Sequence, residues 1–140
     1  MKMLVRSSFL ALAAAWICTQ GTLPAQDTPP VVKAKVPFEF TEMGRTMPAG
    51  EYVIDPANNS ASIILRCREH SVSVIVPTDG LQSAGPQDEA KLIFHRYGDQ
   101  YFLSEVWSSG SSGRKLRQTK LEHDLALRDS PDRAVIAASR

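Results

Sequence analysis

The chain has 140 residues, with 16 Lys and Arg against 15 Asp and Glu, which gives a formal net charge of +1 at pH 7. This near-neutral balance lacks the positive charge typical of proteins that bind nucleic acid, and it includes no polybasic patch for a membrane surface. The length is sufficient for one domain with a modest hydrophobic core. We therefore expect a single domain that binds no nucleic acid.

The first 25 residues have the pattern of a secretory signal peptide. Lys2 and Arg6 give a positive start, and Phe9–Ile17 forms a short apolar run before a small-residue cleavage site at 23–25. The run is shorter than the roughly 20 apolar residues that a transmembrane helix needs. We expect an exported protein, in the periplasm or outside the cell, with no transmembrane helix. Cleavage lowers the formal charge to −1.

The rest of the chain contains six segments in which apolar and polar residues alternate, as in half-buried strands. We expect strands at Lys33–Thr41, Glu51–Asp55, Ala61–Arg68, Ser71–Pro77, Ala90–Tyr97 and Gln100–Trp107. Pro37 places the first strand at a sheet edge or at a bulge, because proline has no N–H to donate. The third and fourth strands align all their apolar residues in one register, which sets Leu65 opposite Val74.

The fifth and sixth strands form the clearest hairpin of the chain. The Gly-Asp pair at 98–99 favours a tight two-residue turn, because glycine accepts a positive φ. The register set by this turn places Arg96 opposite Tyr101 and Leu92 opposite Glu105. Both faces of the hairpin carry large apolar groups, which predicts that its two strands are central and covered on both sides.

A short helix is expected after the strands. Thr119 and Glu122 form the capping-box pattern at the start of Lys120–Arg128. Leu121 and Leu125 lie one turn apart, so we expect them to pack on the sheet. Two other segments have no apolar alternation: 78–89 reads as a long polar loop, and 108–113 reads as a flexible link.

Short strands at hairpin spacing predict an all-β fold, namely a small antiparallel β-sandwich-like or barrel-like domain of about six strands with a short C-terminal helix. We favour the sandwich-like form over an up-and-down barrel. The predicted organisation is a signal peptide at 1–25, a flexible lead-in at 26–32, the β domain with its helix at 33–128 and a tail at 129–140.

Motifs of enzyme and metal sites are missing from the sequence. It has no Gly-rich phosphate loop, no Gly-x-Ser-x-Gly elbow and no His-Glu-x-x-His. His70, His95 and His123 have no ligand spacing, and Cys67 alone would survive export. We therefore predict no catalytic residue, no metal site and no cofactor.

Candidate ligand- or partner-binding residues gather on the predicted hairpin: His95, Arg96, Tyr97, Tyr101, Glu105 and Trp107. His95 is the best single candidate, because a neutral imidazole can bind a ligand or move a proton. The alternative is that its imidazole only makes a hydrogen bond within the hairpin. Arg96 either binds an anion or makes a cation–π contact with Tyr101. The rings of Tyr101 and Trp107 suit a carbohydrate or peptide surface, or else belong to the core. Glu105 needs a partner wherever it is buried.

Three segments together resemble a group of small uncharacterised exported bacterial proteins: Val36–Phe40 (VPFEF), Pro48–Tyr52 (PAGEY) and Lys91–Leu103 (KLIFHRYGDQYFL). The resemblance extends from about Lys33 to Leu125. It implies an exported all-β domain, and it brings no established activity, cofactor or catalytic residue.

These observations favour binding over catalysis. The leading hypothesis is an exported, non-catalytic domain that binds an envelope protein, a polysaccharide or a small ligand. One alternative is a small-molecule carrier that uses the interior of a barrel. Another is a small hydrolase-like enzyme using His95 with Glu105 or Asp99, although the predicted register places His95 and Glu105 on opposite faces.

Overall fold

The computed structural model describes residues 31–57 and 61–140. The predicted signal peptide and residues 26–30 of the predicted lead-in lie outside these ranges. Within them the chain forms ten strands and one helix. The elements are β1 (Val32–Val36), β2 (Phe40–Glu42), β3 (Arg45–Met47), β4 (Gly50–Pro56), β5 (Ser62–Cys67), β6 (Ser73–Gln87), β7 (Lys91–Tyr97), β8 (Gln100–Trp107), β9 (Gly110–Leu116), α1 (Lys120–Ala126) and β10 (Asp132–Ser139).

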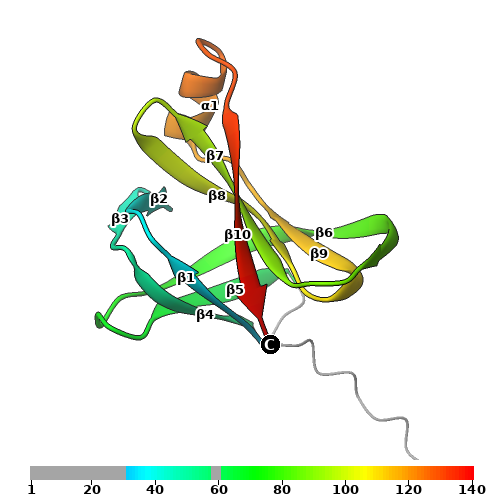
Figure 1. The fold of residues 1–140 in the computed structure, drawn as a ribbon. Helices are drawn as coiled ribbons and strands as arrows, with labels where there is room; N and C mark the ends of the chain where they lie inside the picture. Colours follow the sequence, from blue (N-terminus) through cyan, green and yellow to red (C-terminus); the bar gives the residue numbers. More distant parts are fainter. Residues whose placement is uncertain (1–30, 58–60) are drawn as a thin grey trace, which may run out of the picture.

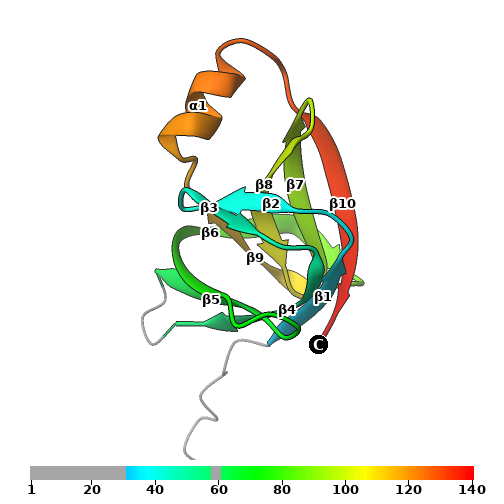
Figure 2. The same cartoon turned by 90° about the vertical axis from the view of Figure 1, so that its left-hand side faces the viewer.

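Eight of the strands close into an antiparallel barrel (Figures 1 and 2). Around the barrel the order is β1-β4-β5-β6-β9-β8-β7-β10, and β10 pairs again with β1. The meander β7-β8-β9 is flanked by β6 next to β9 and by β10 next to β7, which is a Greek-key arrangement. The all-β, antiparallel fold with one short helix is therefore confirmed. The described strands number ten and not about six, and eight of them form a closed barrel where we favoured a sandwich.

Pro37 divides the predicted first strand into β1 and β2. Without an N–H it cannot continue the hydrogen-bond ladder, and it lies exposed between the two strands. β1 stays in the barrel wall, whereas β2 turns away and pairs with β3. β2 also touches β8 through one parallel pair, Thr41 with Phe102. The β2–β3 hairpin therefore lies beside one end of the barrel, near α1 (Figure 2).

The two predicted hairpins are both present. In β5–β6 Leu65 lies opposite Val74, as the apolar pattern indicated. In β7–β8 Arg96 lies opposite Tyr101, as the Gly-Asp turn indicated. Local turn geometry and apolar alternation were thus sufficient to fix both registers close to the turns.

The predicted β7–β8 register is wrong beyond a bulge between Ile93 and Phe94. Leu92 lies opposite Val106, and Glu105 lies opposite Ile93, one position from the prediction. A bulge adds one residue to one strand and so changes which residues face each other. Here it lets Leu92 and Val106 both join the core, while Glu105 is only half-buried.

Three segments that were not predicted to be strands also form strands. The predicted loop at 78–89 belongs largely to β6, whose first part pairs with β5 and whose second part pairs with β9. The predicted link at 108–113 contributes to β9, and the predicted tail at 129–140 contains β10. β9 and β10 are paired on both sides, whereas 78–87 pairs with β9 alone. Backbone pairing of this kind leaves little trace in the side-chain pattern.

Aromatic side chains close the barrel at the end near α1. Phe38 stacks on Tyr101 with ring centroids 3.8 Å apart and meets Phe94 edge-on at 5.0 Å. Phe40 also makes edge contacts with Tyr52 and Phe94, and the ring centroids are 5.2 Å apart in each pair. This end of the barrel interior is therefore filled by side chains, as the core of a small barrel normally is.

The side chain of Trp107 leaves no room for a Cβ at position 113 of β9, so this position requires glycine. A Cβ at this position would lie 2.6 Å from two carbons of the indole ring. We expect Gly113→Ala to lower the free energy of unfolding by about 1–3 kcal/mol, the usual cost of overpacking. Urea denaturation measures the change.

The matched control is Gly80→Ala on β6, where a Cβ would meet nothing within 4 Å. Gly80 pairs with Arg114, the residue next to Gly113. We expect this variant to stay within about 0.5 kcal/mol of the unmodified chain. Equal losses in the two variants would contradict the role assigned to the Trp107 ring.

Candidate functional site

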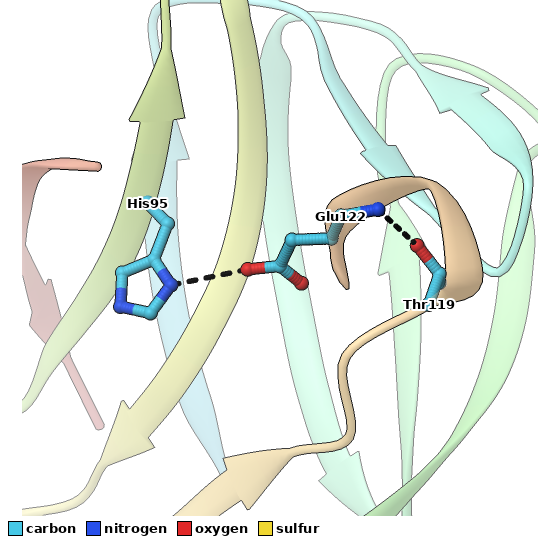
Figure 3. A network of polar contacts seen from close by, with 3 residues as sticks. All are labelled: His95, Thr119 and Glu122. Atoms are coloured by element: carbon cyan, nitrogen blue, oxygen red, sulfur yellow. Dashed lines mark hydrogen bonds and ion pairs between the residues drawn. The ribbon is translucent and has the colours of Figure 1, made fainter. Parts of the chain in front are cut away.

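His95 contacts a residue that is distant in the sequence. Its Nδ1 lies 3.0 Å from Oε1 of Glu122, which reaches it from α1 (Figure 3). The Glu122 side chain is 5% exposed and that of His95 is 27% exposed. Because an ionised carboxylate only accepts hydrogen bonds, this contact assigns a proton to Nδ1. The imidazole is thereby held in one orientation on the outer face of β7.

Helix α1 is positioned by this glutamate. Thr119 caps the helix as predicted, and its Oγ1 accepts a hydrogen bond of 3.3 Å from the backbone N–H of Glu122 (Figure 3). Leu121 is 49% exposed, so the predicted packing through this residue is wrong, whereas Leu125 is half-buried. In this fully described helix Glu122 is the one buried residue. A hydrogen bond between Glu122 and His95 therefore joins α1 to β7. Among the described residues no helix is long and apolar enough to cross a membrane.

Glu42, from β2, is a second buried carboxyl group beside the first. Its residue is 3% exposed, and burial raises its pKa from 4.5 to about 8, with the nearby charge of Glu122 adding to the rise. A hydrogen bond from the backbone of Met43 opposes this rise in pKa. At neutral pH Glu42 is therefore mostly protonated, which spares the fold two adjacent buried negative charges.

Tyr97 completes this group, which we call the α1 cluster: His95, Tyr97, Glu42 and Glu122. The ring of Tyr97 packs edge-on against His95 and Phe102, at 6.5 and 5.9 Å. Its hydroxyl is buried and has no hydrogen-bond partner among the described residues. Burial, followed by the charge of Glu122, raises the pKa of the Tyr97 phenol. The phenol therefore stays protonated at physiological pH.

The other predicted site residues lie apart from this cluster. Arg96 lies over the ring of Tyr101 at 5.8 Å, which confirms the predicted cation–π contact, and its Nε donates to the Gly98 carbonyl at 2.7 Å. On β8 the indole N–H of Trp107 donates to Glu105 at 2.7 Å. The structure therefore divides the six candidates into three groups, of which only His95 and Tyr97 belong to the α1 cluster.

Glu122 is the carboxylate that the structure brings to His95. The hydrolase-like alternative named Glu105 or Asp99 for this position, but Glu105 is bonded to Trp107 on the same strand. The described residues contain no group of three or more His, Cys, Asp or Glu side chains arranged to hold a metal ion. The α1 cluster thus combines a protonated acid, a carboxylate–imidazole pair and a phenol, and it connects α1 to β7 through the hydrogen bond between His95 and Glu122.

A cavity of about 810 Å³ opens at the other end of the barrel. This end lies near the C-terminus and away from α1 (Figure 1). Its lining comes from β1, β4, β5, β6, β8 and β9, together with Arg140 after β10. We call this space the open-end cavity. A second cavity, of about 350 Å³, adjoins it and shares Ser109 and Arg140.

The open-end cavity has an apolar floor and a polar rim. Val32, Ile54 and Ile63 in the floor are 2–3% exposed and belong to the core. The rim is the serine- and glycine-rich segment 108–113. It is shaped by its own contacts, since Ser108 Oγ donates to the carbonyl of Ser112 at 3.2 Å.

Comparison with known proteins finds no matching family model, no matching curated protein and no matching solved structure.

Sequence reasoning missed Glu42, Glu122 and the open-end cavity. For Glu42 a signal existed, because strand alternation that places Phe40 on the buried face also places position 42 on that face. For Glu122 the capping pattern was visible, but it indicated a side chain bonded to its own helix. The segment that forms the rim has the composition of a linker, which hides its place in a strand.

Proposed function

We propose that this chain is an exported, non-catalytic binding domain that holds a small molecule in the open-end cavity. The observation that carries the proposal is the cavity itself, whose volume of about 810 Å³ is within the range of small-molecule sites. Eight-stranded barrels are wide enough to hold one small ligand. The signal-like pattern of residues 1–25 supports export.

The contrast between the two barrel ends supports this choice. Near α1 the interior is filled by Phe38, Phe94 and Tyr101, which pack against one another. At the opposite end the residues that the structure describes include no comparable group of aromatic side chains, and core residues form the floor of the cavity. The hydrolase-like alternative has less support, because neither cavity described above is lined by His95 or Glu122.

The test uses the chain purified after export from a bacterial host. We expect Nile red, a neutral dye that fluoresces in apolar surroundings, to bind saturably at one site per chain. Ser112→Trp should abolish this binding, because Ser112 lines the cavity and an indole would occupy its mouth. Native mass spectrometry of the same samples would show any co-purified small molecule.

Lys115→Trp is the matched control, since Lys115 is exposed on the same strand and does not line the cavity. Both variants should give the circular dichroism spectrum of the unmodified chain. Dye binding that is absent in the unmodified chain, or that survives Ser112→Trp, would overturn the proposed site.

A further inference from the structure

We propose that helix α1 is a proton-controlled cover on the outer face of β7, which stays closed while Glu42 keeps its proton and is released when Glu42 ionises. This inference goes beyond the function proposed above and does not depend on the open-end cavity. It is carried by the geometry of the α1 cluster, in which β2, β7 and α1 each bring titratable groups to one buried place.

Helix α1 is the element of this cluster that can leave with the fewest broken contacts. All seven of its residues are described, and Glu122 is the only one of them that is buried. Of the hydrogen bonds between described residues, only the one between Glu122 and His95 joins α1 to the barrel. By contrast, β2 is held by backbone pairing with β3 and β8. Release of α1 therefore breaks no strand pairing.

The two buried carboxyl groups belong to different elements, so they can separate. Glu42 comes from β2 and Glu122 from α1, whose side chain points from the helix toward β7 (Figure 3). With α1 in place, ionisation of both groups would bury two neighbouring negative charges, and repulsion and lost hydration would both oppose this closed form. Movement of α1 away from β7 takes Glu122 into water and relieves both costs.

The titratable groups of β7 do not reverse this effect. His95 has a proton on Nδ1 in its neutral form and in its charged form, so it donates to Glu122 in either form. A second proton on its ring would strengthen this contact at low pH, which also favours the closed form. The phenol of Tyr97 stays neutral, and its buried hydroxyl brings no charge to the cluster.

The charged groups of the other neighbouring elements also leave the effect in place. On β3, Arg45 lies opposite Glu42, but it is exposed, and no ion pair joins the two among the described residues. On β8, Glu105 accepts a hydrogen bond from Trp107. The remaining titratable residues of α1 are exposed to water: Lys120, His123 and Asp124.

The direction and steepness of the response follow from the proton that is released on opening. The pKa of Glu42 is raised from 4.5 to about 8 in the closed form, because the group is buried and lies near Glu122. Release of α1 removes Glu122 and lets water reach Glu42, so this pKa returns toward its ordinary value. Between the two values the open form binds fewer protons. The equilibrium constant for opening therefore rises by up to about tenfold per pH unit and levels off above about pH 8.

Hydrogen exchange of the α1 amides in the full exported chain tests the proposal. A helix of seven residues is not stable alone in water, so release of α1 frees the N–H groups of His123 and Leu127, which otherwise bond to carbonyls of the same helix turn. We expect the protection of these two amides, relative to an unstructured peptide at the same pH, to fall by about tenfold per pH unit between pH 6 and 8. At every pH it should be at least about tenfold lower than that of the β7 amides, which pair with β8 and β10. Glu42→Gln should remove most of the pH dependence.

Asp124→Asn is the matched control, because Asp124 is an exposed carboxylate on the same helix. This variant should keep the full pH dependence. Equal protection of the α1 and β7 amides would mean that the helix opens only when the whole barrel unfolds, and it would overturn the proposal. Low protection of α1 that is independent of pH would also overturn it, as would a pH dependence that survives Glu42→Gln.

Discussion

Glu42→Gln is expected to raise the free energy of unfolding at pH 9 by up to about 5 kcal/mol, while leaving it nearly unchanged at pH 4. The reason is the rise of the Glu42 pKa from 4.5 to about 8 on folding, since each pKa unit corresponds to about 1.4 kcal/mol. Glutamine keeps the shape of the neutral acid and cannot ionise. Urea denaturation of the two proteins at several pH values measures the difference.

The sign of this effect follows from proton binding. Between pH 4.5 and about 8 the folded chain keeps the Glu42 proton, whereas the unfolded chain has released it. Stability therefore falls as the pH rises through this interval and levels off above it. Below the interval both states are protonated, so the carboxyl group and the amide are equivalent. At each pH, the difference in free energy of unfolding between the variant and the unmodified chain removes the contributions of the other titrating groups, because both proteins share them.

Glu39→Gln is a suitable control, because Glu39 lies three residues before Glu42 and is exposed. We expect its stability profile to run parallel to that of the unmodified chain. The same parallel profile for Glu42→Gln would contradict a protonated, buried Glu42. In Glu122→Gln the fall in stability between pH 4.5 and 8 should become smaller without vanishing, because burial is the larger cause of the pKa shift.

Local patterns predicted the parts of this fold that depend on neighbouring residues. The Gly-Asp turn at 98–99 set the first pairs of β7–β8, and apolar alternation set the register of Leu65 with Val74. Thr119 marked the start of α1 because an N-cap is also a local feature. The bulge between Ile93 and Phe94 was not predictable in this way, since it serves packing across the barrel.

Parts of the fold that depend on distant partners left weaker signals. The inward residues of β10 include Ala134 and Ala138, whose small side chains make little apolar contrast. The contact between His95 and Glu122 joins positions 27 residues apart, and each residue alone had an ordinary local explanation. The open-end cavity exists only where six strands meet, so no single segment indicated it.

Removal of residues 131–140 is expected to abolish cooperative unfolding. β10 pairs with β7 along six positions and with β1 at two, and so it joins the two ends of the barrel wall. Without it the wall would have two open edges, and the core would be exposed to water along the gap. Near-ultraviolet circular dichroism and urea denaturation of the truncated chain measure the loss. A truncated chain with an unchanged unfolding midpoint would show that the barrel does not need closure by this strand.

Two substitutions at adjacent positions of β10 test whether the inner face of this strand packs against the core, in a chain that keeps the strand. Ile136 packs against the core, whereas the neighbouring Val135 is 54% exposed on the outer face. Ile136→Asp should cost several kcal/mol, because it directs an unpaired charge toward the core. Val135→Asp should stay within about 0.5 kcal/mol, as surface substitutions usually do. This asymmetry is expected only if β10 lies in the barrel wall in the register described, with Val135 opposite Ile93. Equal effects would mean that the strand is held at the surface, and closure of the barrel would then have to come from other pairings.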